Sequence, residues 1–143
     1  MSSAADQRIR DFFEAYAAAA LAGEAETVSS SYFSTYIEAA PSTIEAFKVD
    51  DEYRRAVEAK ANAMRELGLA ALGIEVSGTT QLAPEHLLVE AEWRLYFAPE
   101  GADSIETHFR VSYVVRLKDG DPVILLALSH EDEEKVLRDL GLA

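Results

Sequence analysis

The hydrophobic period of this chain changes along its length, and that change constrains the fold more than any other feature. Up to Leu67 the long segments repeat apolar residues every three or four positions, which is the spacing of an amphipathic helix. From Leu72 onward apolar and polar residues alternate, which is the spacing of a β-strand with one buried face. Helices followed by a run of strands predict an α+β domain in which helices cover one face of an antiparallel sheet.

The first half of the chain predicts two long helices with shorter elements between them. The first helix ends at Gly23 and carries an apolar stripe of Ile9, Phe12, Phe13, Tyr16 and Ala20. The second begins after the N-cap Asp50 and ends near Leu67, with a stripe of Tyr53, Val57, Ala61 and Met64. A short helix and two short strands are expected between them, over residues 24–30, 32–39 and 43–49.

The second half predicts a four-stranded antiparallel meander and a last helix. Turn residues at 83–85, 99–101 and 118–121 separate the strands expected over residues 73–82, 86–97, 104–118 and 122–128. Ser129 and Asp132 resemble a capping box, so we expect the C-terminal helix to begin there and to end at Gly141.

Alternation along the two longest strands assigns one apolar and one charged face to the sheet. Trp93 lies on the apolar face, and we predict that it is buried. On the charged face, Glu90 and Glu92 are expected to pair across the hairpin with Arg110 or Arg116. Residues 123–128 are apolar on both faces, which predicts a strand covered on both sides, one of them by a second subunit.

Composition limits the size of the protein and its partners. The chain has 143 residues, 49% apolar and 27% charged, which predicts one globular domain over residues 1–143. Its 13 Lys and Arg against 26 Asp and Glu give a formal net charge of −13, which repels nucleic-acid phosphates and anionic lipids. Residues 1–7 lack the features of a signal peptide. We therefore expect a cytoplasmic protein that binds neither nucleic acid nor membrane.

Motifs for cofactors and metals are missing from the sequence. The chain contains no cysteine and no glycine-rich nucleotide loop, metalloprotease, esterase or calcium-loop motif. His86, His108 and His130 also lack the close helical spacing that is common in metal sites. We therefore expect no cofactor and no metal.

Two segments resemble the nuclear transport factor 2-like (SnoaL-like) superfamily, with no specific characterised member. They are Asp11-Phe12-Phe13-Glu14-Ala15-Tyr16 followed by Ala22-Gly23-Glu24, and the late strand pair over residues 112–117 and 122–130. The resemblance implies a cystatin-like cone, in which a curved mixed or antiparallel sheet wraps around a long helix, with helices at both termini. It implies a site in the open mouth of the cone, but not an activity, because the family includes both enzymes and noncatalytic proteins.

Comparison with the ketosteroid isomerase branch of this family separates the residues that match from those that do not. Tyr16 stands seven residues before Gly23, as does the tyrosine that is an oxyanion donor in that branch. The position of the branch's aspartate base is Ala40, before Pro41, and its second oxyanion group falls near Tyr113. Glu38 lies on the same strand face as Ala40 and is the best substitute base, provided that burial raises its pKa.

Three functions remain open from the sequence. The first is a homodimer that binds a small apolar molecule in its cone, in a pocket lined by Phe12, Tyr16, Met64, Trp93, Phe109 and Tyr113. The second is a cofactor-free lyase or isomerase for a hydrophobic carbonyl or polyketide-like substrate, with Tyr16 as donor and Glu38 as base. The third is a structural or adaptor dimer whose cone is filled by its own side chains.

Overall fold

The computed structural model describes residues 3–117, 119 and 121–142, which form four α-helices and one six-stranded sheet. The elements are α1 (Ser3–Ala22), α2 (Ala25–Ser30), β1 (Tyr32–Ala40), β2 (Thr43–Lys48), α3 (Asp51–Glu66), β3 (Leu69–Ala83), β4 (His86–Phe97), β5 (Ile105–Arg116), β6 (Val123–Ser129) and α4 (Glu133–Asp139). This is the predicted α+β order. Asp50 is the N-cap of α3, as predicted, because its carboxylate accepts a hydrogen bond from the backbone N–H of Tyr53.

Two predicted boundaries are wrong. β3 begins at Leu69 rather than residue 73, because its first residues pair with the end of β4 although they do not alternate. α4 begins after Asp132, and Ser129 is instead the last residue of β6. The Asp132 carboxylate accepts hydrogen bonds from the backbone N–H and the hydroxyl of Ser42, so it joins two loops and makes no cap. Lys118 and Gly120, in the turn predicted at 118–121, lie outside the described residues.

The sheet is mixed and has the strand order β2-β1-β6-β5-β4-β3. Strands β3 to β6 form the predicted antiparallel meander, while β1 is antiparallel to β2 and parallel to β6. β6 therefore lies in the interior of the sheet, between β1 and β5. Its inner residues Ile124 and Ala127 are buried, but Leu128 on the outer face is 43% exposed. Within one chain, β6 is covered on one side and not on both.

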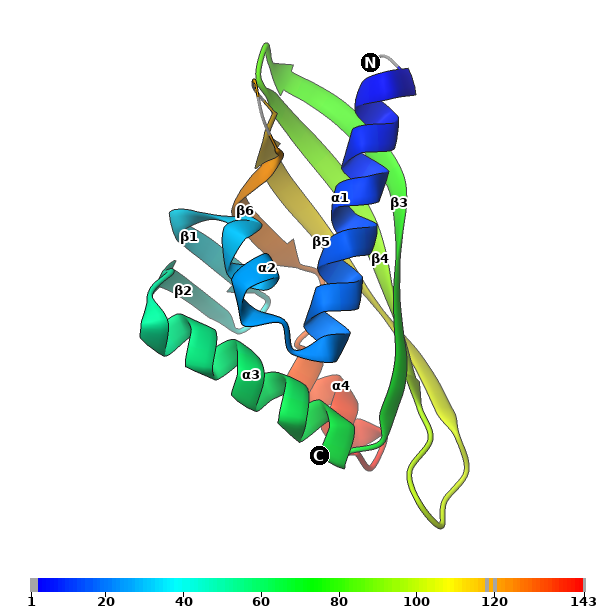
Figure 1. The fold of residues 1–143 in the computed structure, drawn as a ribbon. Helices are drawn as coiled ribbons and strands as arrows, with labels where there is room; N and C mark the ends of the chain where they lie inside the picture. The colour runs from blue at the N-terminus through cyan, green and yellow to red at the C-terminus, as the bar shows by residue number, and fades with distance from the viewer. Residues whose placement is uncertain (1–2, 118, 120, 143) are drawn as a thin grey trace.

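The helices gather on the concave side of the curved sheet, which gives the cone expected from the sequence (Figure 1). Ile9 and Phe13 of α1 are fully buried, and the ring of Phe13 lies 4.8 Å from that of Tyr113 on β5. Trp93 is 9% exposed on the same inner face, so its predicted burial is confirmed. Within the described residues, no helix is both long and apolar enough to cross a membrane.

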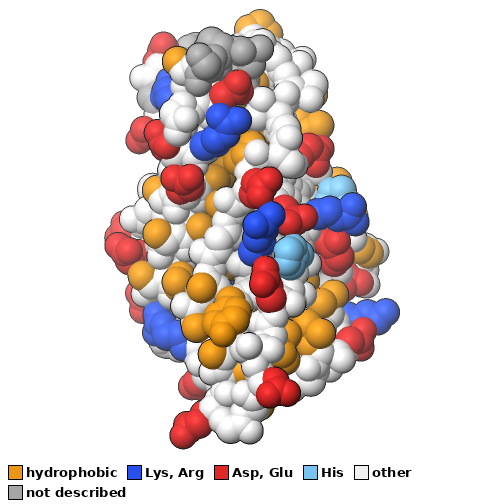
Figure 2. All heavy atoms as spheres, turned by 90° about the vertical axis from the view of Figure 1, so that its right-hand side faces the viewer, with side chains coloured by type: hydrophobic (Ala, Val, Ile, Leu, Met, Phe, Trp, Pro, Cys, Tyr) orange, Lys and Arg blue, Asp and Glu red, His pale blue; other side chains and the backbone are white. Residues whose placement is uncertain are grey.

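The outer face of the sheet carries the predicted charges, but the predicted partners are wrong. Glu92 lies 3.1 Å from Nδ1 of His108 and 3.4 Å from Nε of Arg94. Arg110 turns to Glu131, and Arg116 to Glu85. Long side chains reach diagonal or same-strand neighbours as easily as the residue opposite, so register alone does not determine the pairs. Figure 2 shows side chains of both signs close together on one face of the molecule, beside hydrophobic ones.

The pKa of Glu92 is lowered, chiefly by its hydrogen bond with His108 and further by Arg94.

Candidate functional site

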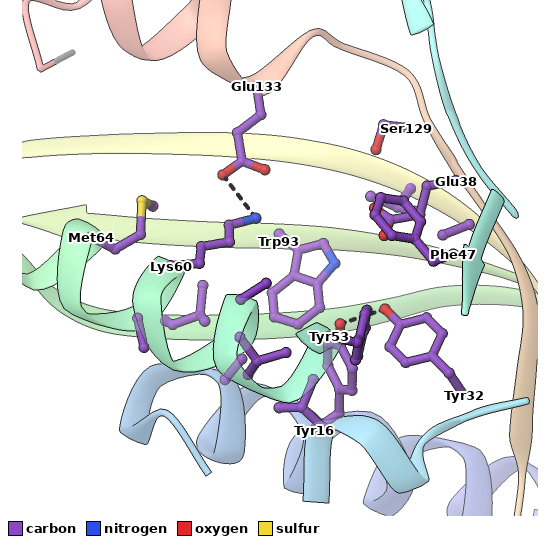
Figure 3. A pocket seen from close by; sticks show the side chains of 18 of the residues that line it. Tyr16, Tyr32, Glu38, Phe47, Tyr53, Lys60, Met64, Trp93, Ser129 and Glu133 are labelled. Atoms are coloured by element: carbon purple, nitrogen blue, oxygen red, sulfur yellow. Dashed lines mark hydrogen bonds and ion pairs between the residues drawn. The ribbon is translucent and has the colours of Figure 1, made fainter. Parts of the chain in front are cut away.

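A cavity of about 620 Å³ lies between α1, α3 and the concave face of the sheet. Five of the six predicted pocket residues line it, namely Tyr16, Met64, Trp93, Phe109 and Tyr113. Met64 and Lys60 come from α3, and Trp93 faces them from β4 across the cavity (Figure 3).

Phe12 does not line the cavity. It is half-buried and packs edge-on against its neighbour Phe13, with ring centroids 5.0 Å apart. α1 contributes Tyr16, Ala20 and Leu21 to the lining, all from its C-terminal half. Phe12 shares the helix face of Tyr16 but lies one turn, about 6 Å, nearer the N-terminus, which is beyond the end of the cavity. Periodicity predicted the correct face of the helix, but it carries no information about depth along the axis.

Tyrosine hydroxyls form the polar part of the cavity wall. Tyr16 of α1 and Tyr32 of β1 share a hydrogen bond of 2.5 Å between their hydroxyl oxygens. On β4 and β5, Nε1 of Trp93 donates to the hydroxyl of Tyr113 at 2.8 Å. These bonds fix the orientation of rings that come from four different elements, because each hydroxyl has a partner on another element.

A second set of hydroxyls forms a chain that ends on Glu38. Tyr36 donates its hydrogen to Oε2 of Glu38 at 2.7 Å, and the hydroxyls of Tyr36 and Tyr53 are 2.8 Å apart. A hydroxyl has one hydrogen, and that of Tyr36 is used on Glu38, so Tyr53 is the donor in its bond with Tyr36. The direction of the chain is therefore Tyr53 to Tyr36 to Glu38.

Burial keeps these tyrosines protonated. It is the main reason why the pKa values of Tyr16, Tyr32, Tyr36 and Tyr113 are raised well above the ordinary value. Burial also raises the pKa of Tyr53 to about 12. At neutral pH all five side chains are neutral hydroxyls, so they orient polar atoms by hydrogen bonds and do not supply a negative charge.

Glu38 lines the cavity and is also exposed to solvent. Glu38 lies on the same face of β1 as Tyr36, so its side chain points toward the concave side of the sheet. Figure 3 shows it next to Phe47, at the edge of the view. The structure thus brings Glu38 and Tyr16, the two predicted catalytic residues, to one cavity. The burial that the hypothesis of a catalytic base required is lacking, because the carboxylate is at the mouth.

Except for Glu38, the charged rim of the cavity was missed by the sequence analysis. Nζ of Lys60 on α3 lies 3.8 Å from Oε1 of Glu133 on α4, and this pair is drawn in Figure 3. Among the described residues, the lining has two ammonium groups and five carboxylates, those of Lys48 and Lys60 and of Glu38, Asp50, Glu52, Glu131 and Glu133. Apart from Glu38 and the N-cap Asp50, these residues read as ordinary surface charges in the sequence, and only the packing of the elements against one another gathers them.

The described residues contain no group of three or more His, Asp or Glu side chains that could hold a metal ion.

Comparison with known proteins identifies the fold. No protein-family model matches this sequence. Among curated proteins there is no match either. A solved domain of unknown function with a cystatin-like fold, from Nostoc punctiforme PCC 73102, superposes with a TM-score of 0.69 at 18% identity, covering 100% of this chain and 89% of that one.

Two further solved structures have a similar fold. An NTF2-like protein of unknown function from Shewanella oneidensis MR-1 has a TM-score of 0.68 at 15% identity, covering 88% of this chain and 98% of its own. A ketosteroid isomerase-like protein from Erwinia carotovora atroseptica SCRI1043 has a TM-score of 0.62 at 11% identity, covering 84% of this chain and 90% of that one. At these identities the likeness shows the fold. The chain therefore has the NTF2-like, cystatin-like fold that its sequence resembles.

Proposed function

We propose that this protein binds a small, largely apolar molecule in the cavity between α1, α3 and the concave face of the sheet. The observation that carries this proposal is the open volume of about 620 Å³. Ligand pockets have volumes of roughly 300 to 1,000 Å³, are lined mainly by apolar and aromatic side chains and contain a few placed polar groups. Trp93, Phe109 and Met64 supply such a lining here, and tyrosine hydroxyls supply the polar groups. An open cone favours ligand binding over the adaptor with a filled cone.

Mass spectrometry of the protein purified from its native host tests this proposal. We expect a stoichiometric small molecule to copurify with the unmodified chain and to be lost from Val57→Trp, in which the larger side chain enters the cavity from α3. Glu58→Trp is the matched control, because Glu58 is the next residue of the same helix, is exposed and does not line the cavity. Equal amounts of molecule in both variants would reject the cavity as the binding site.

A second candidate is a cofactor-free lyase or isomerase that acts on a hydrophobic carbonyl compound. The observation that favours it is that Tyr16 and Glu38 line one cavity, which is the geometric requirement for a donor and a base on one substrate. Glu38→Gln should then abolish turnover of a neutral substrate and leave its binding largely intact, since only the proton acceptor is lost. Unchanged turnover in this variant would remove Glu38 as the base.

We also propose that the protein is a homodimer that pairs through the outer face of the sheet. An outer apolar patch of Ile37, Ile44 and Leu128 remains exposed on β1, β2 and β6. These residues lie on one face in adjacent strands. Ile44 is paired with Ala39, Ala39 with Leu128, and Leu128 with Ser112. The neighbouring strands carry charges of both signs, including Glu92 and Arg94. Such a face is complementary to a second copy of itself, related by a twofold axis.

A further inference from the structure

We infer that the molecule held in the cavity carries a protonated amine on its apolar body, and that the amine lies against Glu38. This inference rests on the proposed binding function, because it names the chemical class of the molecule in that same cavity. Its basis is the direction of the hydrogen bonds, the aromatic rings beside Glu38 and the sign of the charges around the lining.

The tyrosine chain that ends on Glu38 offers acceptors and no donor to a ligand. In the chain from Tyr53 to Tyr36 to Glu38, both hydroxyl hydrogens are already used. The Glu38 carboxylate keeps free acceptor positions, and the oxygen of Tyr53 keeps its lone pairs. A carbonyl or carboxylate of a ligand finds no hydrogen on the hydroxyls of Tyr36 and Tyr53, whereas an ammonium group donates as many as three.

The other tyrosine hydroxyls of the lining keep hydrogens that no described residue accepts. The hydroxyl of Tyr113 accepts from Trp93, and its own hydrogen has no acceptor among the described residues. The pair of Tyr16 and Tyr32 likewise uses one hydrogen between two hydroxyls. These hydrogens suit an uncharged acceptor atom of the ligand, such as a carbonyl or ether oxygen. The pair of Tyr16 and Tyr32 adjoins the Glu38 chain, because the ring of Tyr32 stacks on that of Tyr36 with centroids 4.0 Å apart. The lining therefore offers a carboxylate to an amine of the ligand and hydroxyl hydrogens to an acceptor atom on the same ligand.

Aromatic rings beside Glu38 favour a cation further. Phe47 and Tyr53 both line the cavity, and their ring centroids are 6.2 Å apart. Figure 3 shows Glu38 next to Phe47. The face of an aromatic ring attracts an ammonium group within about 6 Å of its centroid, and the attraction adds to that of a carboxylate.

The charges of the lining also favour a cationic ligand. Five carboxylates against two ammonium groups leave an excess of three negative charges among the described lining residues. Within this set Glu133 is paired with Lys60, and Glu131 is paired with Arg110 from outside the lining, so an excess of two negative charges remains after these pairs. An anionic ligand is therefore repelled at the mouth, and a cationic one is attracted and concentrated there.

Three probes with one apolar body test the inference: cyclohexylbutylamine, cyclohexylbutanol and cyclohexylbutyrate. Trp93 is the only tryptophan of the chain and lines the cavity, so quenching or enhancement of its fluorescence reports binding of each probe at neutral pH. We expect the amine to bind about tenfold more tightly than the alcohol, with the carboxylate weakest. Glu38→Gln should reduce the advantage of the amine about threefold and leave the affinity for the alcohol unchanged.

The control is Glu58→Gln, which removes the same charge from an exposed position of α3 that does not line the cavity. It should leave all three affinities unchanged. If the alcohol or the carboxylate binds as tightly as the amine, or if the two variants behave alike, the inference is overturned while the binding function stands. If none of the three probes changes the Trp93 signal, the cavity is rejected as a binding site and the inference with it.

Discussion

At the scale of single residues, the cavity wall depends on side chains that combine a large apolar ring with one polar atom. Trp93 and Tyr113 belong to adjacent strands and are joined by a hydrogen bond, so neither is free to rotate. Tyr16 and Tyr32 are fixed to each other in the same way across α1 and β1. Because the hydroxyls of these three tyrosines each have a hydrogen-bond partner, the wall tolerates buried oxygen atoms that would otherwise destabilise the fold.

Trp93→Ala should lower the free energy of unfolding by about 3 kcal/mol, which is the lower end of the range for truncating a buried Trp, because the side chain already borders a cavity. Urea denaturation followed by circular dichroism measures the change. Tyr113→Phe is the control: it removes only the hydroxyl that accepts from Trp93 and should cost about 1 kcal/mol. Equal losses in the two variants would contradict the packing role of the indole.

The raised pKa values of five tyrosines, four of which line the cavity, predict that the protein is sensitive to alkali. Since these groups have a higher pKa in the folded chain than in the unfolded one, their stabilising contribution is complete below about pH 10 and falls as the pH rises through and above this value. Between about pH 10 and the pKa that a tyrosine has in the folded chain, that tyrosine lowers the free energy of unfolding by as much as about 1.4 kcal/mol per pH unit.

Denaturation midpoints at about pH 9 and about pH 11 measure this loss, and phenolate absorbance follows ionisation directly. The chain has six tyrosines, of which Tyr96 is 41% exposed. We expect no more than one of the six to ionise before the protein unfolds. Progressive ionisation of several tyrosines in a chain that stays folded would contradict the burial of the hydroxyl network.

At the scale of elements, the junction between α3 and β3 determines how the long helix meets the sheet. Gly68 has a φ of +99°, and an added Cβ would lie 2.8 Å from the backbone nitrogen of Pro99. Its carbonyl accepts a hydrogen bond of 2.8 Å from the backbone N–H of Ala98. The end of α3 is therefore held against the loop that follows β4, and this contact holds Lys60 and Met64 opposite Trp93.

Gly68→Ala should destabilise the protein by at least about 2 kcal/mol, because a left-handed conformation and a backbone clash are both imposed on the new side chain. Gly73→Ala, in β3, is the matched control, since nothing lies within 4 Å of its added Cβ. That substitution should leave stability unchanged or raise it slightly. Thermal denaturation of the two variants gives the comparison, and similar melting temperatures would show that the junction tolerates a side chain.

At the scale of the whole molecule, one side of the sheet is covered by helices and the other is not. The inner face holds the core and the cavity, while Ile37, Ile44 and Leu128 remain 44%, 79% and 43% exposed on the outer face. Contiguous exposed apolar side chains bordered by polar ones are typical of surfaces that bind another protein. The sheet itself therefore separates the proposed ligand site from the proposed contact between subunits.

We expect light scattering at micromolar concentration to give twice the chain mass of 15.7 kDa. Leu128→Glu combined with Ile37→Glu should give the mass of one chain with an unchanged circular dichroism spectrum, because charges in the outer apolar patch oppose its burial. Leu82→Glu is the control, since Leu82 is also exposed but lies on β3, at the opposite edge of the sheet. A monomer in the unmodified protein would reject the dimer.

The sequence by itself determined the order and type of the elements, because hydrophobic period and capping are local properties of the chain. The stripe from Tyr53 to Met64 and the N-cap Asp50 define α3, and alternation places Trp93 on the inner face. Two predicted boundaries are wrong, one where a residue fits two local patterns and one where the alternation of a strand is absent. Ser129 resembles a cap but pairs in β6, and residues 69–72 form strand without alternating.

Only the tertiary structure decided which of these residues share the cavity. The approach of Glu38 to Tyr53 through Tyr36, and of Lys60 to Glu133, joins elements that are far apart in the sequence. The exclusion of Phe12 depends on where the cavity ends along α1. Periodicity specifies the direction in which a side chain points, whereas depth, pairing and enclosed volume depend on distances between elements, and those distances are set when the elements pack together.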